Sequence, residues 1–400
     1  MTTTERVNRL ESAAPGRPDR RTSLVIVREQ VEDREIANFL PLVGEFDIRL
    51  VTSATSGPYA ASGLGIPSTS LARFGDALKP RFLRRRLRDR LAPRFDLDRL
   101  RGFGAAVRDA DVICINENHM VSSLQAVQAK EKHPHLRIVN VCYENIAFNY
   151  DADPILRTRR ERVRAATDLF VAMSPSTRDA LVTEGVSTSR IAVIPYGVDP
   201  NRFGDRGDRP SIRSELGISD DDIVFTYTGR LLREKGLAEL LAAFAELQVG
   251  SARLLIVGSG PESGRLRGAA AALGVSGLVH FLGWATPDRV AGLLAASDAF
   301  VLPSLPTPYW EEQLGFSLVE AMATGLACIG TDTGSIPFIL GDAGVVVRPY
   351  DKPSLSGALR RLTVDPTHRA ELGVAARRRV QTELSVETVS ARLREAIVTA

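Results

Sequence analysis

Two cationic side chains follow an apolar run in the second half of the sequence. Arg230 and Lys235 lie in the segment 228–236, TGRLLREKG, directly after the apolar run 223–227. The run predicts a buried strand, and ligands of open α/β sheets bind outside the carboxyl ends of strands. A guanidinium offers a planar fork and an ammonium a point charge, and both suit a phosphate. The segment therefore predicts either a phosphate site or a solvated basic loop.

A carboxylate, a glycine and a predicted helix start occur together further along the chain, in the segment 310–325, WEEQLGFSLVEAMATG. Ser317 and Glu320 have the spacing of a capping box, so Glu320 is expected to cap the helix. Glu312 precedes the helix and has no such structural role. Gly315 would let the backbone approach a ligand closely, and the free amides of a helix start bind anions. Together these features suit a ligand with both hydroxyls and phosphates, such as a nucleotide sugar.

These segments resemble the donor-binding domain of GT-B glycosyltransferases, and in particular the large retaining family 4. The resemblance is carried by the segment 229–236, by the Glu312-x7-Glu320 element and by the segment 194–203, IPYGVDPNRF. It is strong over residues 165–345 and weaker over 22–160. It implies an α/β fold of two Rossmann-like domains that face each other across a cleft, and a transferase that moves a hexosyl group, with retention, from a nucleoside-diphosphate sugar to a hydroxyl acceptor.

The resemblance also implies roles for individual residues. Arg230 and Lys235 would hold the donor diphosphate and stabilise its charge as the glycosidic bond breaks. Glu312 would contact the sugar hydroxyls, and Glu320 would take the ribose hydroxyls. The other donor-binding candidates are Gly229, Gly258, Gln313, Leu314, Gly315, Phe316 and Ser317.

No cofactor and no metal are expected, and the donor is expected to be a UDP- or GDP-sugar. The resemblance implies that fixed cations and a helix N-terminus do what Mg²⁺ does in other transferases. Four Asp-x-Asp pairs occur in the chain, but none directly follows a strong apolar run. Gly258 belongs to a glycine-rich turn, whose spacing and Pro261 favour a tight strand-to-helix turn over a dinucleotide fingerprint.

The first half would bind the acceptor. His119 follows the predicted strand 112–115, and many members of the family keep a histidine here that reaches the donor sugar, so we count it as a catalytic candidate. The alternative is a loop or helix-capping histidine. The segment 143–145, YEN, is a second candidate to face the cleft. The turn 27–31, VREQV, lacks the glycines that the family often has after its first strand.

Composition and pattern set the organisation of the chain. With 400 residues, 44% hydrophobic and 25% charged, the sequence predicts two or three globular domains and excludes disordered and collagen-like classes. The absence of a long apolar run excludes an integral membrane protein, and three isolated cysteines favour a reducing cytoplasm. We predict a disordered tail (1–21), an acceptor-binding domain (22–195), a donor-binding domain (196–385) and a last helix (386–400) that crosses back to the first domain, as the family's does.

The first half is basic, with 30 Lys and Arg against 24 Asp and Glu in residues 1–195. Residues 79–101 hold ten of these basic side chains, and 82–94 has the pattern of a cationic amphipathic helix. Such a helix could rest on anionic lipid at the inner face of the membrane, bind an anionic or lipid-linked acceptor, or be a solvated helix face. Nucleic acid is not expected as a partner, because no aromatic platform accompanies the arginines.

Two other functional classes stay open. One is a GT-B hydrolase or epimerase, which would consume the nucleotide sugar without an acceptor. The other is a catalytically silent sugar-nucleotide-binding accessory protein.

Overall fold

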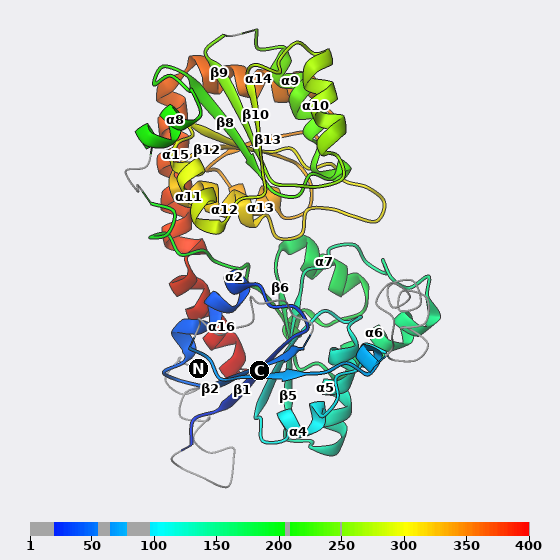
Figure 1. The fold of residues 1–400 in the computed structure, drawn as a ribbon. Coiled ribbons are helices and arrows are strands. Elements are labelled where there is room, and N and C mark those ends of the chain that lie inside the picture. The colour runs from blue at the N-terminus through cyan, green and yellow to red at the C-terminus, as the bar shows by residue number, and fades with distance from the viewer. Residues whose placement is uncertain (1–19, 55–64, 78–96, 205–208, 249, 400) are drawn as a thin grey trace.

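The computed structural model describes residues 20–54, 65–77, 97–204, 209–248 and 250–399 of the chain. The chain forms two lobes, each built on one parallel β-sheet with helices around it (Figure 1). Most of the tail predicted for residues 1–21 and most of the basic segment 79–101, including the helix predicted for 82–94, lie outside the described residues.

The N-terminal sheet has seven parallel strands in the order β3-β2-β1-β4-β5-β6-β7. Its strands are β1 (Ser23–Arg28), β2 (Asp47–Ser53), β3 (Ser68–Leu71), β4 (Val112–Asn116), β5 (Arg137–Cys142), β6 (Leu169–Ala172) and β7 (Ile191–Val193). Its helices are α2 (Asp33–Ile36), α4 (Phe103–Val107), α5 (Val121–Lys132), α6 (Pro154–Ala166) and α7 (Pro175–Thr183), with the 3-10 helices η1 (Ala37–Leu42), η2 (Phe74–Ala77) and η3 (Thr188–Arg190).

The C-terminal sheet has six parallel strands in the order β10-β9-β8-β11-β12-β13. Its strands are β8 (Ile223–Thr228), β9 (Ala252–Val257), β10 (Val279–Gly283), β11 (Ala299–Leu302), β12 (Ala327–Thr331) and β13 (Val345–Val347). Its helices are α8 (Arg209–Glu215), α9 (Leu237–Ala245), α10 (Ser263–Ala272), α11 (Pro287–Ala295), α12 (Phe316–Thr324), α13 (Ile336–Leu340), α14 (Lys352–Val364) and α15 (Pro366–Arg379), with the short 3-10 turn η4 (Arg233–Lys235).

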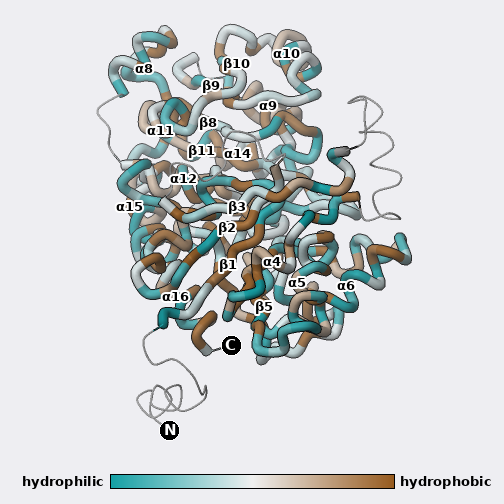
Figure 2. Tube along the Cα trace, turned by 60° about the horizontal axis from the view of Figure 1, so that its bottom comes forward, coloured by the Kyte–Doolittle hydropathy of each residue, from teal (hydrophilic) through white to brown (hydrophobic). Residues whose placement is uncertain are grey.

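The central strands are buried on both faces, which is why they are continuous apolar runs in the sequence. All six residues of β1 are buried, as are all four of β11. Figure 2 shows the hydrophobic colour concentrated along β1 and its neighbours. In each sheet the strand order reverses at one point, between β1 and β4 and between β8 and β11. Open α/β sheets bind ligands at the carboxyl side of such a switch point.

The last helix packs on the lobe opposite to the one that precedes it in the chain. A π-helical turn, η5 (Val380–Leu384), leads into α16 (Val386–Thr399), which lies beside η1 at the N-terminal sheet (Figure 1). The buried side chains of Val389, Leu393 and Ile397 share a core cluster with residues of β1 and β2. The chain passes from the first lobe to the second near Val198 and returns near Leu384. There the Val198 amide donates to the Leu384 carbonyl at 3.0 Å.

The capping box predicted for Ser317 and Glu320 is wrong. Helix α12 begins after Gly315, whose φ is +57°, and no side chain caps it. Ser317 therefore lies inside the first turn, whereas a capping side chain must precede the helix on extended backbone. Glu320 is left without a structural role at the helix start and turns toward the other lobe.

Candidate active site

Lys235 and Glu312 form an ion pair at the carboxyl edge of the C-terminal sheet. Lys235 ends η4, which follows β8, and Glu312 lies in the loop between β11 and α12. Lys235 Nζ is 2.6 Å from Glu312 Oε2, and Ser304 Oγ donates to the same oxygen at 2.6 Å. The two charged side chains are only 12% and 9% exposed. Two of the predicted catalytic residues thus meet in a nearly buried, hydrogen-bonded group.

Glycines allow the backbone packing that places this pair. Gly236, at a φ of +68°, ends the turn that carries Lys235, and a Cβ there would lie 1.9 Å from the Pro303 carbonyl oxygen. Gly258 packs against the turn after β8 in the same way, because its Cβ would lie 1.8 Å from the Gly229 carbonyl oxygen. The structure thus gives Gly258 a tight-turn packing role. Arg230 follows this contact and is exposed.

Buried polar atoms without a partner occur at the carboxyl edge of the C-terminal sheet and in the loop of the other lobe that contacts Glu312. Within the described part of the chain, the hydroxyls of Thr228, Thr333 and Ser335 and the Asn145 side-chain oxygen have no hydrogen-bond partner. The Ser335 amide donates to the Glu312 carbonyl at 2.8 Å, and Thr228 is the last residue of β8. Buried polar groups are normally paired, so a cluster of unpaired ones at a strand edge indicates a place for a polar ligand.

The segment 313–317, predicted to frame the donor, is held by the N-terminal lobe. Phe316 is 7% exposed and its ring stacks on Tyr196 at 5.8 Å between centroids. The Arg34 guanidinium lies over the same ring at 4.4 Å. Leu314 packs partly buried against the core cluster of that lobe. The donor candidates and the N-terminal lobe are therefore physically coupled.

Glu320 points to the same contact. Its carboxylate oxygen lies 3.9 Å from Arg34 Nη1, and its side chain is 14% exposed. Burial raises the pKa of Glu320 to about 7, although the Arg34 charge acts to lower it. Neither Arg34 nor its reach across the lobes was predicted, because no local pattern marks it.

Three further hydrogen bonds join the carboxyl-end loops of the two sheets. Asn145 Nδ2 donates to the Glu312 carbonyl at 3.2 Å, and Asn149 Nδ2 donates to the Tyr309 carbonyl at 3.1 Å. Ser176 Oγ donates to the Gly334 carbonyl at 3.3 Å. The carboxyl edges of the two sheets therefore face each other, and the predicted candidate segment 143–145 reaches the loop that carries Glu312.

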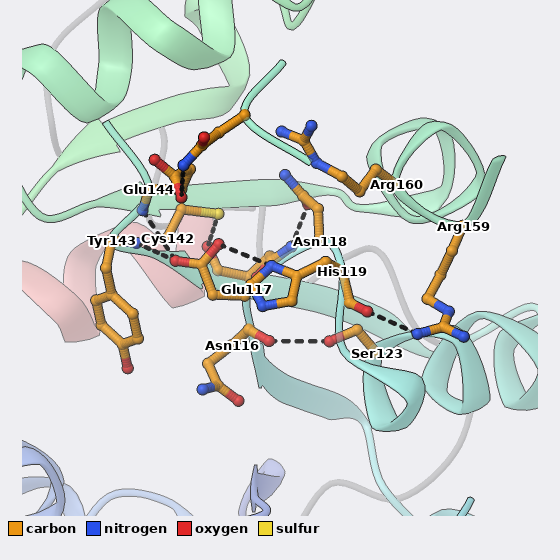
Figure 3. A network of polar contacts seen from close by, with 12 residues as sticks. Asn116, Glu117, Asn118, His119, Ser123, Cys142, Tyr143, Glu144, Arg159 and Arg160 are labelled. Atoms are coloured by element: carbon orange, nitrogen blue, oxygen red, sulfur yellow. Dashed lines mark hydrogen bonds and ion pairs between the residues drawn. The ribbon is translucent and has the colours of Figure 1, made fainter. Parts of the chain in front are cut away.

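His119 lies in a polar network of the N-terminal lobe (Figure 3). Its ring stacks on Tyr150 with centroids 4.4 Å apart, and its Nδ1 is 3.9 Å from Glu117 Oε2. Burial, aided by the charges of Arg160 and Arg159, lowers the pKa of His119 to about 4, so the imidazole is neutral at pH 7. Every contact that the structure gives His119 among its described residues comes from this lobe, and none joins it to Lys235 or Glu312.

Glu117 joins this network to the loop that follows β5. Its Oε1 accepts the backbone N–H groups of Tyr143 and Glu144 at 2.5 and 2.9 Å. Burial raises the pKa of Glu117 to about 7, and the two N–H bonds act against this rise. The left-handed backbone of Glu117, at a φ of +58°, marks a strained position at the end of β4.

The turn after β1 is closed by charged side chains in place of glycine. Arg28 is fully buried, with Nε 3.4 Å from Glu35 Oε2 and Nη2 donating to Tyr196 Oη at 3.3 Å. Glu29 accepts from Ser122 Oγ at 2.9 Å, at the start of α5, and pairs with Arg73 at 2.9 Å. In place of glycine, this turn thus has charged side chains that ion pairs and hydrogen bonds hold in position.

In the described ranges, no three His, Cys, Asp or Glu side chains gather as they would around a metal ion. Over the same residues, the structure has no helix both long and apolar enough to cross a membrane.

Comparison with solved structures identifies the fold. Among solved structures, HepE from Anabaena in complex with UDP and glucose has a TM-score of 0.78 at 18% identity, over 95% of this chain and 100% of that chain. WaaG, a glycosyltransferase involved in lipopolysaccharide biosynthesis, has a TM-score of 0.65 at 17% identity, over 94% and 100%. At these identities the likeness shows the fold, and the predicted GT-B architecture of two Rossmann-like units is confirmed.

Two family models match consecutive parts of the sequence. "Glycosyltransferase Family 4" matches residues 37–202, and "Glycosyl transferases group 1" matches residues 208–379. The chain belongs to the group 1 glycosyltransferases, as the resemblance predicted.

Curated relatives match over part of their length. A D-inositol 3-phosphate glycosyltransferase of Rhodococcus erythropolis is 33% identical over 55% of this chain and 51% of its own. A GDP-mannose-dependent monoacylated alpha-(1-6)-phosphatidylinositol monomannoside mannosyltransferase of Corynebacterium glutamicum is 35% identical over 50% and 54%. The chain thus spans about half the length of the curated relatives it matches.

Proposed function

We propose that the protein transfers a hexosyl group from a nucleoside-diphosphate sugar to a hydroxyl acceptor, with retention of configuration and without a metal ion. The observation that carries the proposal is the Lys235–Glu312 pair, set among unpaired buried polar atoms at the switch point of the C-terminal sheet. The names of relatives support it, since one relative is called GDP-mannose-dependent and the structural neighbour HepE was solved with UDP and glucose.

The donor side supplies charge and orientation. The ammonium of Lys235 and the guanidinium of Arg230 would bind the diphosphate, and their charge would stabilise it more strongly as it leaves. Glu312 would accept hydrogen bonds from the sugar hydroxyls, and Glu320 from the ribose hydroxyls. The backbone amides of 313–317 would frame the sugar and phosphate.

The bond changes follow a front-face displacement. The bond between the anomeric carbon and the diphosphate oxygen breaks, and the acceptor oxygen bonds to that carbon on the same face. The leaving diphosphate takes the proton of the acceptor hydroxyl, so the products are the glycoside and a nucleoside diphosphate. Glu312 forms no bond to the sugar in this scheme, and its Oε2 accepts from Lys235 and Ser304.

The N-terminal lobe would bind the acceptor. His119, neutral at pH 7, would donate a hydrogen bond to a sugar hydroxyl without adding charge to the site. Relatives are named for inositol 3-phosphate and for a phosphatidylinositol mannoside, so an anionic or lipid-linked hydroxyl acceptor is proposed here. A peripheral membrane contact through residues 79–101, on the cytoplasmic side, belongs to the same proposal.

The test is a donor screen in the presence of EDTA, followed by turnover. We expect one of the UDP-, GDP-, ADP- or TDP-sugars to raise Tm, since a ligand at 100 times its Kd adds about 2.7 kcal/mol. Lys235→Ala and Glu312→Gln should abolish transfer, and Lys352→Ala, which removes an exposed lysine paired with Glu246, should not. Loss of the signal in EDTA would refute metal independence. Full turnover by Lys235→Ala would refute the assignment of the site.

The same screen separates the other functional classes. Donor consumption that does not depend on any acceptor would identify a nucleotide-sugar hydrolase or epimerase. Donor binding without turnover, across phosphorylated, lipid-linked and free sugar acceptors, would identify an accessory protein.

A further inference from the structure

The ammonium of Lys235 has a second neighbour besides Glu312. Lys235 Nζ lies 4.7 Å from the centroid of the Trp310 ring, which is within the range of a cation–π contact. Trp310 belongs to the loop 303–312, PSLPTPYWEE, between β11 and α12. The side chain that would meet the donor diphosphate is thus held between a carboxylate and an aromatic face.

The two neighbours act differently on the charge. Glu312 is an anion and partly cancels the field of the ammonium. The indole face attracts the ammonium through its quadrupole but carries no net charge, so the positive charge stays available to a phosphate. Because Lys235 is only 12% exposed, this attraction works in a poorly hydrated place, where it is strongest. A flexible lysine stem otherwise has many rotamers, and the ring would select among them.

The loop that carries Trp310 is fastened at several points. The Thr307 amide donates to the Trp310 carbonyl at 2.8 Å, and Tyr350 Oη donates to the Pro306 carbonyl at 2.8 Å. From the opposite lobe, Asn149 Nδ2 donates to the Tyr309 carbonyl. The place of the ring therefore depends on contacts from both halves of the chain.

We propose that Trp310 is a positioning residue for Lys235, and that its indole face holds the ammonium where the leaving diphosphate of the donor gains charge. The proposal rests on the proposed function, because it names the group that places the cation of that site. Trp310 itself touches no reacting atom in this scheme. Its effect reaches the reaction through Lys235 alone.

The first experiment is an aromatic series at position 310. Trp310→Tyr, Trp310→Phe and Trp310→Leu are compared for kcat and donor KM, with Tyr309→Leu as the control. Tyr309 lies in the same loop with a 77% exposed side chain, and only its backbone carbonyl takes part in the contact with Asn149. We expect kcat to fall by roughly 10- to 30-fold in the leucine variant, with tyrosine and phenylalanine between it and the wild type.

The pattern of the series decides the outcome. A purely structural role of Trp310 would lower kcat equally in the phenylalanine and leucine variants. Alternatively, it would change Tm while kcat/KM followed no order from tryptophan through the aromatic variants to leucine. Either result, or a leucine variant that behaves as Tyr309→Leu does, would overturn the proposal. Rescue by the aromatic variants supports it.

The second experiment needs no substrate, so it stands apart from the proposed function. The chain has two tryptophans. In protein labelled with 5-fluorotryptophan, Trp284→Phe assigns the ¹⁹F signal of Trp310. We expect Lys235→Met to shift this signal, and Lys352→Met to leave it in place. A signal unmoved by Lys235→Met would refute the contact even in an active transferase. A shift in a protein that turns over no donor would refute the function and retain the contact.

Discussion

Replacing Glu320 by glutamine removes a carboxyl group from a buried place beside Arg34. The carboxylate is 14% exposed and 3.9 Å from the nearest guanidinium nitrogen. Burial raises its pKa from 4.5 to about 7, because the charges of Arg34 and Arg202, which act to lower it, do not replace the lost hydration. Glutamine has the same shape and does not titrate, so the pair of proteins isolates this one ionisation.

The sign and the size follow from linkage. Between pH 4.5 and 7 the unfolded chain loses the Glu320 proton while the folded chain keeps it, so the wild type loses stability as the pH rises through this window. A shift of 4.5 to about 7 corresponds to about 3 kcal/mol at 1.36 kcal/mol per unit. The stability of Glu320→Gln relative to the wild type should therefore increase by about 3 kcal/mol from pH 4.5 to pH 8. For a domain of about 150–250 residues, which is the size class of the C-terminal lobe that contains Glu320, that is roughly 6–12 °C in Tm.

The assay is thermal unfolding of both proteins in matched buffers at pH 4.5, 6 and 8. Comparing two proteins at each pH cancels the titration of distant groups such as Glu117. Glu371→Gln, at an exposed position of α15, is the control and should follow the wild type at every pH. A Tm difference that is constant with pH would refute the reasoning, because it would mean that Glu320 ionises as readily in the folded chain as in the unfolded one.

Three further changes test other parts of the structure. Between pH 4 and 6.5 only the unfolded chain protonates His119, so the wild type gains about 3 kcal/mol of stability as the pH rises through this window. His119→Gln should lack this gain, and denaturant titrations of both proteins at several pH values measure the difference. Leu393→Ala should destabilise by about 2–5 kcal/mol, and hydrogen exchange should show the loss in the N-terminal sheet although the residue is near the C-terminus. Gly236→Ala should abolish donor binding, because its Cβ would lie 1.9 Å from the Pro303 carbonyl oxygen, whereas Gly104→Ala, with nothing within 4 Å, should leave calorimetric binding unchanged.

The strands predicted over 112–115 and 223–227 are almost entirely buried in the structure. A central parallel strand such as β8 is a continuous apolar run and needs no alternation to be seen. The edge strand β3, with the sequence STSL, is mostly exposed and has no such signature. It forms because β2 offers it a row of backbone partners, and this information lies in the neighbouring strand.

The candidate residues of the C-terminal lobe could be predicted because they are close in sequence to strand ends and helix starts. Lys235 and Glu312 were expected to share a ligand, and the structure brings them into contact. The contributions of Arg34 and Asn145 were not predicted in their present roles, because they depend on how two separate sheets face each other. The assignment of Glu320 as a cap failed for a related reason. A local spacing rule placed the helix start, and the backbone of Gly315 set it earlier.

The turn after β1 shows how a departure from a family pattern can keep the fold and change the side-chain contacts. Arg28 takes the space at the strand end and is buried against Glu35 and Tyr196. A buried guanidinium must be paired, so Glu35 is fixed in turn. Arg34 directly precedes Glu35 and is the residue that reaches Phe316 and Glu320. Glycines at this turn would leave the backbone free to approach a ligand. Charged residues instead hold α2 through the Arg28–Glu35 pair, and Arg34 of this helix reaches Phe316 and Glu320 in the C-terminal lobe.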